Sequence, residues 1–310
     1  MQFLENVSLK KYSRYQIGGP ADFFAQIKSK EELIDALSSW KKINPEMNNL
    51  FIMGGGTNIL FNDDGFRGLV IKIDINFIEK NGDELKVGAG VLFADLVSRA
   101  ATDSLSGLEW AGGLPGTVGG AVRGNAGAFM GETKDNLIEI ESLDVNTLEI
   151  KKRNNKECDF NYRNSIFKSG VNEIVLSATY KLKKGDPKKI KEETQAKIDF
   201  RIDRHPLDLP NIGSTFKNVP LEQVKPEVRD EFKDSIKNDP FRVIPVAKLL
   251  VALNLKGRVI GGAKFSEKHP NFIVNFNNAK AKDVLDLIAL AKKEVKAKYS
   301  ISLEEEIMVV

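Results

Sequence analysis

Residues 107–132 read GLEWAGGLPGTVGGAVRGNAGAFMGE and contain nine of the chain's 25 glycines. Glycine is unfavourable inside helices and strands because it loses more conformational freedom on folding than other residues do. A globular chain accepts that cost where its backbone must adopt positive φ or lie directly against a ligand. A second loop, MGGGTNIL at residues 53–60, adds three consecutive glycines after an apolar run. Together the two loops indicate an extended phosphate-bearing ligand, held by backbone N–H groups.

Neither loop matches the common nucleotide-binding motifs. No Gly-Lys-Ser/Thr sequence ends either loop, as a Walker A motif requires. Gly54-Gly55-Gly56 also lacks a later glycine at the spacing of a Rossmann fingerprint. The triplet alone fits a tight structural turn as well as a ligand loop, so the class of ligand stays open at this point.

Composition limits the possible partners. The 310 residues are 42% hydrophobic and 29% charged, and the formal net charge is only +3 with both signs interspersed, which disfavours a general nucleic-acid surface. The chain shows neither an 18-residue apolar run nor a signal-peptide core, so we expect a cytoplasmic protein without a membrane partner. The single cysteine, Cys158, is expected to be a buried small residue, and His205 and His269 show no metal-ligand spacing.

Sequence periodicity predicts an α+β chain. Ser29-Lys30-Glu31-Glu32 has the form of a capping box that opens a helix. Apolar alternation and helical spacing predict further elements: strands at 69–75, 138–145 and 174–182, and helices at 190–201, 246–253 and 281–299. The composition shift at KGDPKKIK (184–191) indicates a domain boundary. Residues 304–310 are predicted to form a last strand, which places Glu304 and Glu306 on one face.

Three short segments carry side chains suited to chemistry, and each has a plainer interpretation. Arg163, beside Tyr162, fits a surface ion pair, but in a pocket its guanidinium would bind a carboxylate or an enolate. Ser214 fits a turn or helix cap, and a serine can also deliver a proton to a carbanion. The acidic run at 304–306 fits a solvated tail, but apolar residues follow it, so one carboxylate can point into a pocket.

The segments occur in an order that resembles a known family. The motifs are YQIGGPAD (15–22), GGGTNIL (54–60), GLPGTVGGAVRGNAGAFMGE (113–132), ECDFNYRNSIFK (157–168), GSTFKN (213–218) and LKGRVIGGAKFSEKHPNFIVN (255–275). Over almost the whole chain this set resembles the bacterial UDP-N-acetylenolpyruvoylglucosamine reductases. The short span between Tyr162 and Ser214 is similar to the type II form of that family.

The resemblance implies a fold and a domain organisation. The expected fold class is α+β, with a two-lobed FAD-binding domain of the vanillyl-alcohol oxidase type and a separate α+β substrate domain. The FAD-binding domain would span residues 1–185, in lobes of roughly 1–68 and 69–185. The substrate domain would span 198–298, and a C-terminal strand at 299–310 would return to the FAD-binding domain. We expect a monomer.

The resemblance also implies cofactors and site residues. FAD would be bound without a covalent link, because Thr57 and its neighbours offer no histidine or cysteine, and NADPH would be the hydride donor. The residues expected to contact FAD are Gly54, Gly55, Gly56, Thr57, Asn58, Pro115, Gly116, Thr117, Gly119, Gly120, Ala121 and Val122. Tyr162, Lys217 and Asn218 would bind the enolpyruvyl ether of UDP-N-acetylglucosamine.

For the chemistry itself, the family implies three catalytic residues. Hydride would go to the β-carbon of the enolpyruvyl group, Arg163 and Glu306 would stabilise the enolate, and Ser214 would protonate the α-carbon. This chain ends LEEEIMVV where the family usually has a pattern such as LEPEVR, so Glu304 is the alternative to Glu306. Arg123 interrupts the glycine segment and would contact a phosphate or face solvent. Two other functions stay open: a flavin oxidase of an alcohol or sugar, and a degenerate nucleotide-sugar-binding protein.

Overall fold

A computed structural model describes all 310 residues of the chain. The chain divides into two compact units, which we describe separately. Unit 1 consists of residues 1–7, 21–55 and 67–200, and unit 2 consists of residues 8–20, 56–66 and 201–310. Compact units are defined by contacts and functional domains by what they bind, so the expected domain boundaries stay a prediction.

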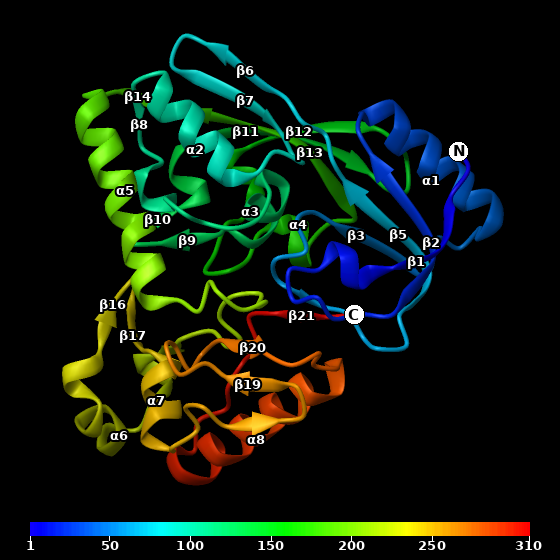
Figure 1. The fold of residues 1–310 in the computed structure, drawn as a ribbon. Coiled ribbons are helices and arrows are strands. Elements are labelled where there is room, and N and C mark those ends of the chain that lie inside the picture. The colour runs from blue at the N-terminus through cyan, green and yellow to red at the C-terminus, as the bar shows by residue number, and fades with distance from the viewer. The chain divides into compact units, whose positions relative to one another are not determined.

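Unit 1 is built on two sheets (Figure 1). One has four strands in the order β1-β2-β5-β3, with β3 parallel to β5, and the other has five antiparallel strands in the order β12-β11-β13-β7-β6. The first sheet contains β1 (Leu4–Ser8), β2 (Pro20–Ile27), β5 (Phe66–Ile73) and β3 (Leu50–Met53). The second contains β12 (Ile150–Asn154), β11 (Leu137–Asp144), β13 (Glu173–Lys181), β7 (Glu84–Gly88) and β6 (Ile78–Asn81). The expected strands at 69–75, 138–145 and 174–182 are therefore confirmed, with ends shifted by one or two residues, and by three at the start of β5.

Helices cover these sheets, and α1 shows how the sequence begins one. The helices are α1 (Lys30–Ile43), α2 (Phe93–Thr102), α3 (Val118–Gly124), α4 (Ile166–Ser169) and α5 (Pro187–Arg204), the last of which crosses into unit 2. The Ser29 hydroxyl accepts the N–H of Glu32 at 3.1 Å, as predicted. The Glu32 carboxylate, however, accepts from the Lys28 N–H at 2.6 Å rather than from Ser29, so the capping box is shifted by one residue. Leu33, Leu37 and Trp40 form the buried stripe of the helix.

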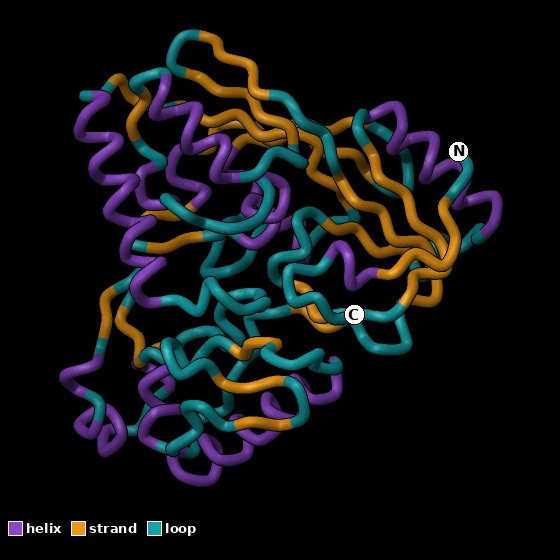
Figure 2. Tube along the Cα trace, viewed as in Figure 1, coloured by secondary structure: helices purple, strands orange, loops and turns teal.

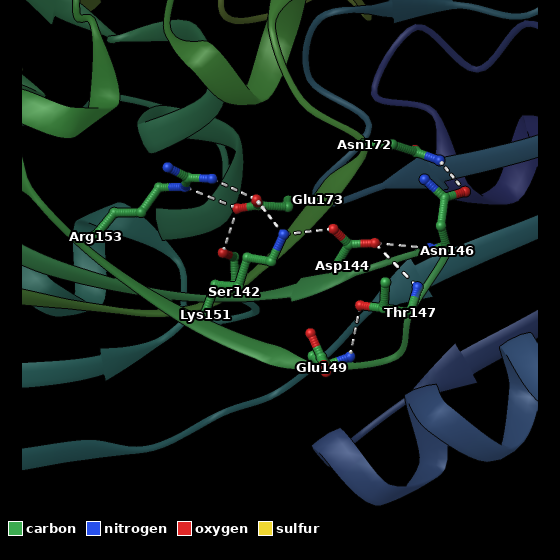
Figure 3. A network of polar contacts seen from close by, with 9 residues as sticks. All are labelled: Ser142, Asp144, Asn146, Thr147, Glu149, Lys151, Arg153, Asn172 and Glu173. Carbon is green, nitrogen blue, oxygen red and sulfur yellow. Dashed lines mark hydrogen bonds and ion pairs between the residues drawn. The ribbon is translucent and has the colours of Figure 1, made fainter.

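A polar network joins β11, β12 and β13 (Figure 3). Arg153 donates two hydrogen bonds to the Glu173 carboxylate, at 3.0 and 2.6 Å, and the Ser142 hydroxyl donates a third at 2.7 Å. The Glu173 side chain is only 1% exposed, so its charge is compensated almost entirely by protein groups. The hydrogen bonds from Arg153 hold the pKa of Glu173 below its usual range. Lys151 lies between Glu173 and Asp144, and its ammonium is 2.6 Å from the Asp144 Oδ2.

Two short antiparallel pairs complete unit 1. They are β8 (Leu105–Ser106) with β14 (Lys183–Lys184) and β9 (Gly127–Ala128) with β10 (Gly131–Glu132). The turn between β9 and β10 places Phe129 and Met130 at φ +52° and +67°, a conformation that usually requires asparagine or glycine.

Unit 2 has shorter strands and more loop (Figure 2). Its elements are β4 (Ile59–Leu60), β15 (Val219–Pro220), α6 (Pro226–Glu231), β16 (Lys237–Asn238), β17 (Arg242–Ile244), α7 (Val246–Ala252), β18 (Val259–Ile260), β19 (Ala263–Phe265), β20 (Ile273–Asn275), α8 (Ala281–Tyr299) and β21 (Met308–Val309). Helix α8 has the predicted bounds, and it packs its apolar stripe into the core of this unit against β18 and β19. The hydrophobic spacing of α8 is therefore satisfied by a single face.

The C-terminal segment departs from the predicted strand at 304–310. Glu305 pairs in an isolated bridge with Phe216, and only Met308–Val309 form a strand, which runs parallel to β4. The segment thus changes its pairing partner at Glu306 and Ile307. A pattern of alternating residues cannot reveal such a change, because both partners come from elsewhere in the chain.

Candidate active site

The glycine triplet lies in the loop between β3 and β4. No hydrogen bond within the chain uses the backbone N–H groups of residues 54–58. Gly54 packs against Thr117, because a Cβ at position 54 would lie 2.3 Å from the Thr117 hydroxyl oxygen. The structure therefore brings together the two predicted glycine segments, and it leaves a run of N–H donors in the first of them. Such a run is the donor set that a diphosphate needs.

The second segment, at the start of α3, has three of its N–H donors already engaged, those of Val118, Gly119 and Gly120. The Val118 N–H donates to the Val91 carbonyl and the Gly119 N–H to the Ala89 carbonyl, both at 2.9 Å. The Thr117 hydroxyl caps the helix by accepting from Gly120 at 3.4 Å. A Cβ at Gly119 would lie 2.9 Å from the Ala89 Cβ. This glycine is thus required for packing, whereas the N–H groups of Gly116 and Thr117, just before the helix, donate to no atom of the chain.

The remaining residues of this stretch differ in exposure. Pro115 and Gly120 are exposed, Gly116 is partly buried, and Ala121 and Val122 are buried. The side of Gly120 is open, with no atom within 3.4 Å of a Cβ built there. A flat ligand can therefore approach the backbone at Gly120 but not the side chain of Val122.

Arg163 is held by the carboxyl half of the glycine segment. Its Nη2 donates to the Gly127 carbonyl at 2.9 Å, and its Cζ lies 4.9 Å from the centre of the Tyr162 ring. Its backbone is left-handed, at φ +56°, which is uncommon for a bulky residue and occurs where the surroundings fix it. The ammonium of Lys168 donates to the Arg163 carbonyl at 2.8 Å and helps to hold that conformation.

The loop that carries Arg163 is bonded to α3 at two further points. The Ser165 hydroxyl donates to the Arg123 carbonyl at 2.8 Å, and the Asn125 amide donates to the Asn161 carbonyl at 3.1 Å. Of the two interpretations of Arg123, exposure to solvent is the weaker, because the side chain is partly buried and burial lowers its pKa. The glycine segment thus fixes the position of the loop that carries Arg163 through these hydrogen bonds.

Ser214 belongs to unit 2 and lies on a short extended segment. Thr215 accepts a backbone hydrogen bond from the Glu306 N–H at 2.8 Å, and the Lys217 N–H donates to the Glu304 carbonyl at 2.9 Å. The structure therefore brings together the predicted serine segment and the predicted acidic segment. The Ser214 hydroxyl is partly exposed and makes no hydrogen bond within the chain.

The three C-terminal glutamates have different surroundings. Glu304 forms an ion pair with Lys217, and Glu305 forms one with Lys292. Glu306 is partly buried, and its backbone carbonyl accepts from the Asn58 amide at 2.9 Å. Glu306 is thus the glutamate whose backbone N–H and carbonyl both have partners, in Thr215 and Asn58.

The two expected substrate-binding residues after Ser214 also have partners within unit 2. The Lys217 side chain is 19% exposed and paired with Glu304. The Asn218 Oδ1 accepts the Val246 N–H at 3.2 Å, which caps α7. Only the remaining N–H donors of these side chains are open to a ligand, so their substrate-binding role stays a prediction.

Two further expectations concern cysteine and histidine. Cys158 is buried as predicted, and burial raises the pKa of its thiol to about 12, which makes it unreactive. His205 and His269, distant in sequence, have ring centres 5.6 Å apart. Burial lowers the pKa of each to about 4, so both are neutral. No group of three metal-ligating side chains occurs in the structure.

Sequence patterns missed two buried asparagines beside Ser214. Asn211 and Asn271 hydrogen-bond the backbone on either side of that serine. The Asn-x-Gly spacing of residues 211–213 is a turn signal that could have indicated the first. No local signal indicates the second, because its partner lies 55 positions away.

Comparisons with known proteins fit this geometry. Residues 21–148 match the FAD binding domain family, and residues 205–310 match the family of the UDP-N-acetylenolpyruvoylglucosamine reductase C-terminal domain. The chain is 37% identical to the UDP-N-acetylenolpyruvoylglucosamine reductase of Clostridium novyi, over 98% of this chain and 91% of that protein. It is 38% identical to that of Fusobacterium nucleatum over the full length of both. The crystal structure of the reductase from Thermus caldophilus superposes with a TM-score of 0.78 at 30% identity, covering 100% of this chain and 99% of the other.

An FAD-binding domain followed by a separate C-terminal domain defines the class: the chain is an FAD-dependent oxidoreductase, and FAD is its cofactor. Given its identity to relatives over their whole length, the chain belongs to the UDP-N-acetylenolpyruvoylglucosamine reductase family. The α+β fold class and the family resemblance are confirmed. No helix combines the length and apolarity that a membrane span needs.

Proposed function

We propose that this protein catalyses the NADPH-dependent reduction of the enolpyruvyl ether of UDP-N-acetylglucosamine to UDP-N-acetylmuramate, a step in peptidoglycan precursor synthesis. FAD, when bound, supplies the chemistry that accepts a hydride from NADPH and passes it to the substrate. Overall the carbon–carbon double bond is reduced: the β-carbon gains the hydride, the α-carbon gains a proton, and NADPH becomes NADP⁺. A cytoplasmic monomer remains our expectation for the protein itself.

Residues 54–58 would bind the FAD diphosphate through their N–H groups. This assignment is supported by the run of N–H donors that no chain atom uses and by the packing of Gly54 against Thr117. Because the N–H groups of Val118, Gly119 and Gly120 are engaged, the first turn of α3 would serve as the wall against the ring system. Gly120 has open space where a side chain would lie, so the ring system would come closest to the backbone at this residue.

Three side chains would stabilise the negative charge that forms on the substrate and then protonate it. Addition of hydride to the β-carbon leaves negative charge at the α-carbon and the adjoining carboxylate. Arg163 would stabilise that charge with its fixed guanidinium fork, and Glu306 would do so as a protonated acid that donates a hydrogen bond. Ser214 would then give its proton to the α-carbon and recover one from solvent.

One observation carries the assignment of the proton donor. The Ser214 hydroxyl is partly exposed and without a hydrogen bond in the chain, while the backbone around it is held by the segment of Glu306. A hydroxyl so placed is available to a substrate atom. A pure binding protein has no need of such an arrangement, and an oxidase of alcohols needs a base rather than a proton donor.

The test follows NADPH consumption by the purified yellow protein, with and without the enolpyruvyl substrate. Substrate-dependent consumption is expected, with one UDP-N-acetylmuramate formed per NADPH. NADPH consumption at the same rate with and without the substrate would favour the oxidase. Protein that never retains FAD would favour the degenerate binder. In Ser214→Ala, NADPH should still reduce bound FAD at the wild-type rate while turnover falls by about 10²-fold or more. Equal loss of both would mean that Ser214 is structural.

A further inference from the structure

The backbone around Ser214 is fixed by two buried asparagines, neither of which belongs to the proposed reaction. Asn271 is 2% exposed and Asn211 is 3% exposed. A buried amide side chain is stable only if its donors and acceptor are satisfied. Here all the partners are backbone groups in the segment that carries Ser214.

Asn271 holds the residues after the serine. Its Oδ1 accepts the Phe216 N–H at 3.1 Å, its Nδ2 donates to the Phe216 carbonyl at 2.8 Å, and its own carbonyl accepts the Thr215 N–H at 2.7 Å. The side chain therefore replaces the peptide group of a neighbouring strand. On the other side, the Thr215 carbonyl accepts the Glu306 N–H, so the serine segment is bonded on both edges.

Asn211 holds the residues before the serine. Its Oδ1 accepts the Gly213 N–H at 3.1 Å, and its Nδ2 donates to the carbonyls of Pro206 and Leu209, both at 2.8 Å. Gly213 lies at φ +88° with open space around it, so the glycine serves the turn rather than packing. The turn that precedes Ser214 is thus closed by one side chain.

We propose that Asn271, together with Asn211, is a positioning residue that aims the Ser214 hydroxyl at the substrate. The inference rests on the proposed function, because it assumes that Ser214 is the proton donor. Fixing the backbone at the residues on each side leaves the hydroxyl itself without a protein partner, so no hydrogen bond must break before the proton moves. Misplacement of a reacting group by about 1 Å can lower a rate about 10²-fold.

The experiment compares two isosteric substitutions in the holoenzyme. Asn271→Asp keeps the acceptor for Phe216 and removes the donor. Asn275→Asp is the matched control: Asn275 is also buried, donates to the Tyr15 carbonyl at 3.0 Å and accepts the Ala279 N–H at 2.8 Å, but its side chain makes no hydrogen bond to residues 213–216. Both place a carboxylate in a similar setting, so differences between them report position rather than loss of stability.

We expect Asn271→Asp to lower kcat about 10²-fold, with the rate of FAD reduction by NADPH unchanged. The kcat of Asn275→Asp should stay within about threefold of the wild-type value. Urea unfolding should show that both variants are destabilised. Hydrogen exchange should quicken in the peptide that contains Thr215 and Phe216 only in Asn271→Asp. In the Ser214→Ala background, Asn271→Asp should lower kcat by less than about threefold further, because residues that act as a unit are not additive.

The outcomes separate this inference from the proposed function. If Ser214→Ala keeps full turnover, the proton donor is wrong and the inference is overturned with it. If Ser214→Ala fails but Asn271→Asp behaves like Asn275→Asp, or its loss adds fully to that of Ser214→Ala, only the inference is overturned. Should Asn271→Asp not fold, Asn211→Asp replaces it, with an expected loss of about tenfold and the same non-additive signature.

Discussion

Substitution of Gly54 by alanine tests the proposed FAD loop directly. The added Cβ would lie 2.3 Å from the Thr117 hydroxyl oxygen, about 1 Å closer than the 3.4 Å at which ordinary contact begins. The Thr117 Cβ and Cγ2 would lie at 3.5 and 3.7 Å, which are ordinary contacts. Gly54 is not among the residues at positive φ, so the backbone itself accepts alanine. The hydroxyl oxygen is therefore the one close contact that the substitution creates.

The expected loss of FAD affinity follows from the free-energy cost of relieving that overlap. Overpacking of this kind costs about 1–3 kcal/mol. We expect the loop of residues 54–58 to shift rather than the N-cap of α3, because its N–H groups are unbonded whereas the N-cap is hydrogen-bonded. If that cost falls on the FAD-bound form, the dissociation constant for FAD rises about 5- to 150-fold. The assay is titration of the apoprotein with FAD, followed by flavin fluorescence, with urea unfolding of the apoprotein measured in parallel.

Two double variants isolate the contact. Thr117→Ala removes the oxygen, so Gly54→Ala with Thr117→Ala should bind FAD within about threefold of Thr117→Ala alone. Thr117→Val puts a methyl group where the oxygen was, so Gly54→Ala with Thr117→Val should remain as weak as Gly54→Ala. FAD affinity unchanged in Gly54→Ala, or equal in the two double variants, would refute the reasoning.

Three further predictions concern the proposed catalytic side chains and the polar network. Glu173→Gln should lower the free energy of unfolding by about 3 kcal/mol at pH 7 in urea titrations, because it leaves the partly buried Arg153 without its charge partner. Since the folded pKa of Glu173 is lowered, that stabilisation is present above the unfolded pKa and is lost as pH falls through the folded pKa, so the difference between variant and wild type should shrink in acid. Arg163→Lys should lower kcat about 10²-fold with FAD reduction by NADPH intact, as stopped-flow measurement would show, because lysine lacks the planar fork. Glu306→Gln should lower kcat about 10²-fold in the steady-state assay, whereas Glu304→Gln, in an exposed ion pair, should stay within about threefold.

Sequence patterns succeeded where one segment decides its own structure. Helix α8 was predicted at its observed bounds from its apolar stripe, which faces one core. In the structure an Asp283 cap and a left-handed Ser300 mark its ends. The glycine segment likewise predicts a ligand-facing backbone, and that role stays a prediction. In both cases the information is local.

Prediction failed where the partner comes from elsewhere in the chain. The short strands β15 to β17 have two or three residues each, too few for a period to show. The donors of Val118 and Gly119 proved to be engaged by residues 91 and 89, which no motif discloses.

The choice between Glu304 and Glu306 shows why the site needed both kinds of information. Alternation places the two glutamates on one face and treats them alike. In the structure Lys217 forms an ion pair with Glu304, and Lys292 forms one with Glu305. The proposed role requires a neutral acid that donates a hydrogen bond to the substrate. We propose Glu306 for this role, because it lies where the chain leaves the serine segment for β4 and its backbone is bonded to Thr215 and to Asn58, just before β4.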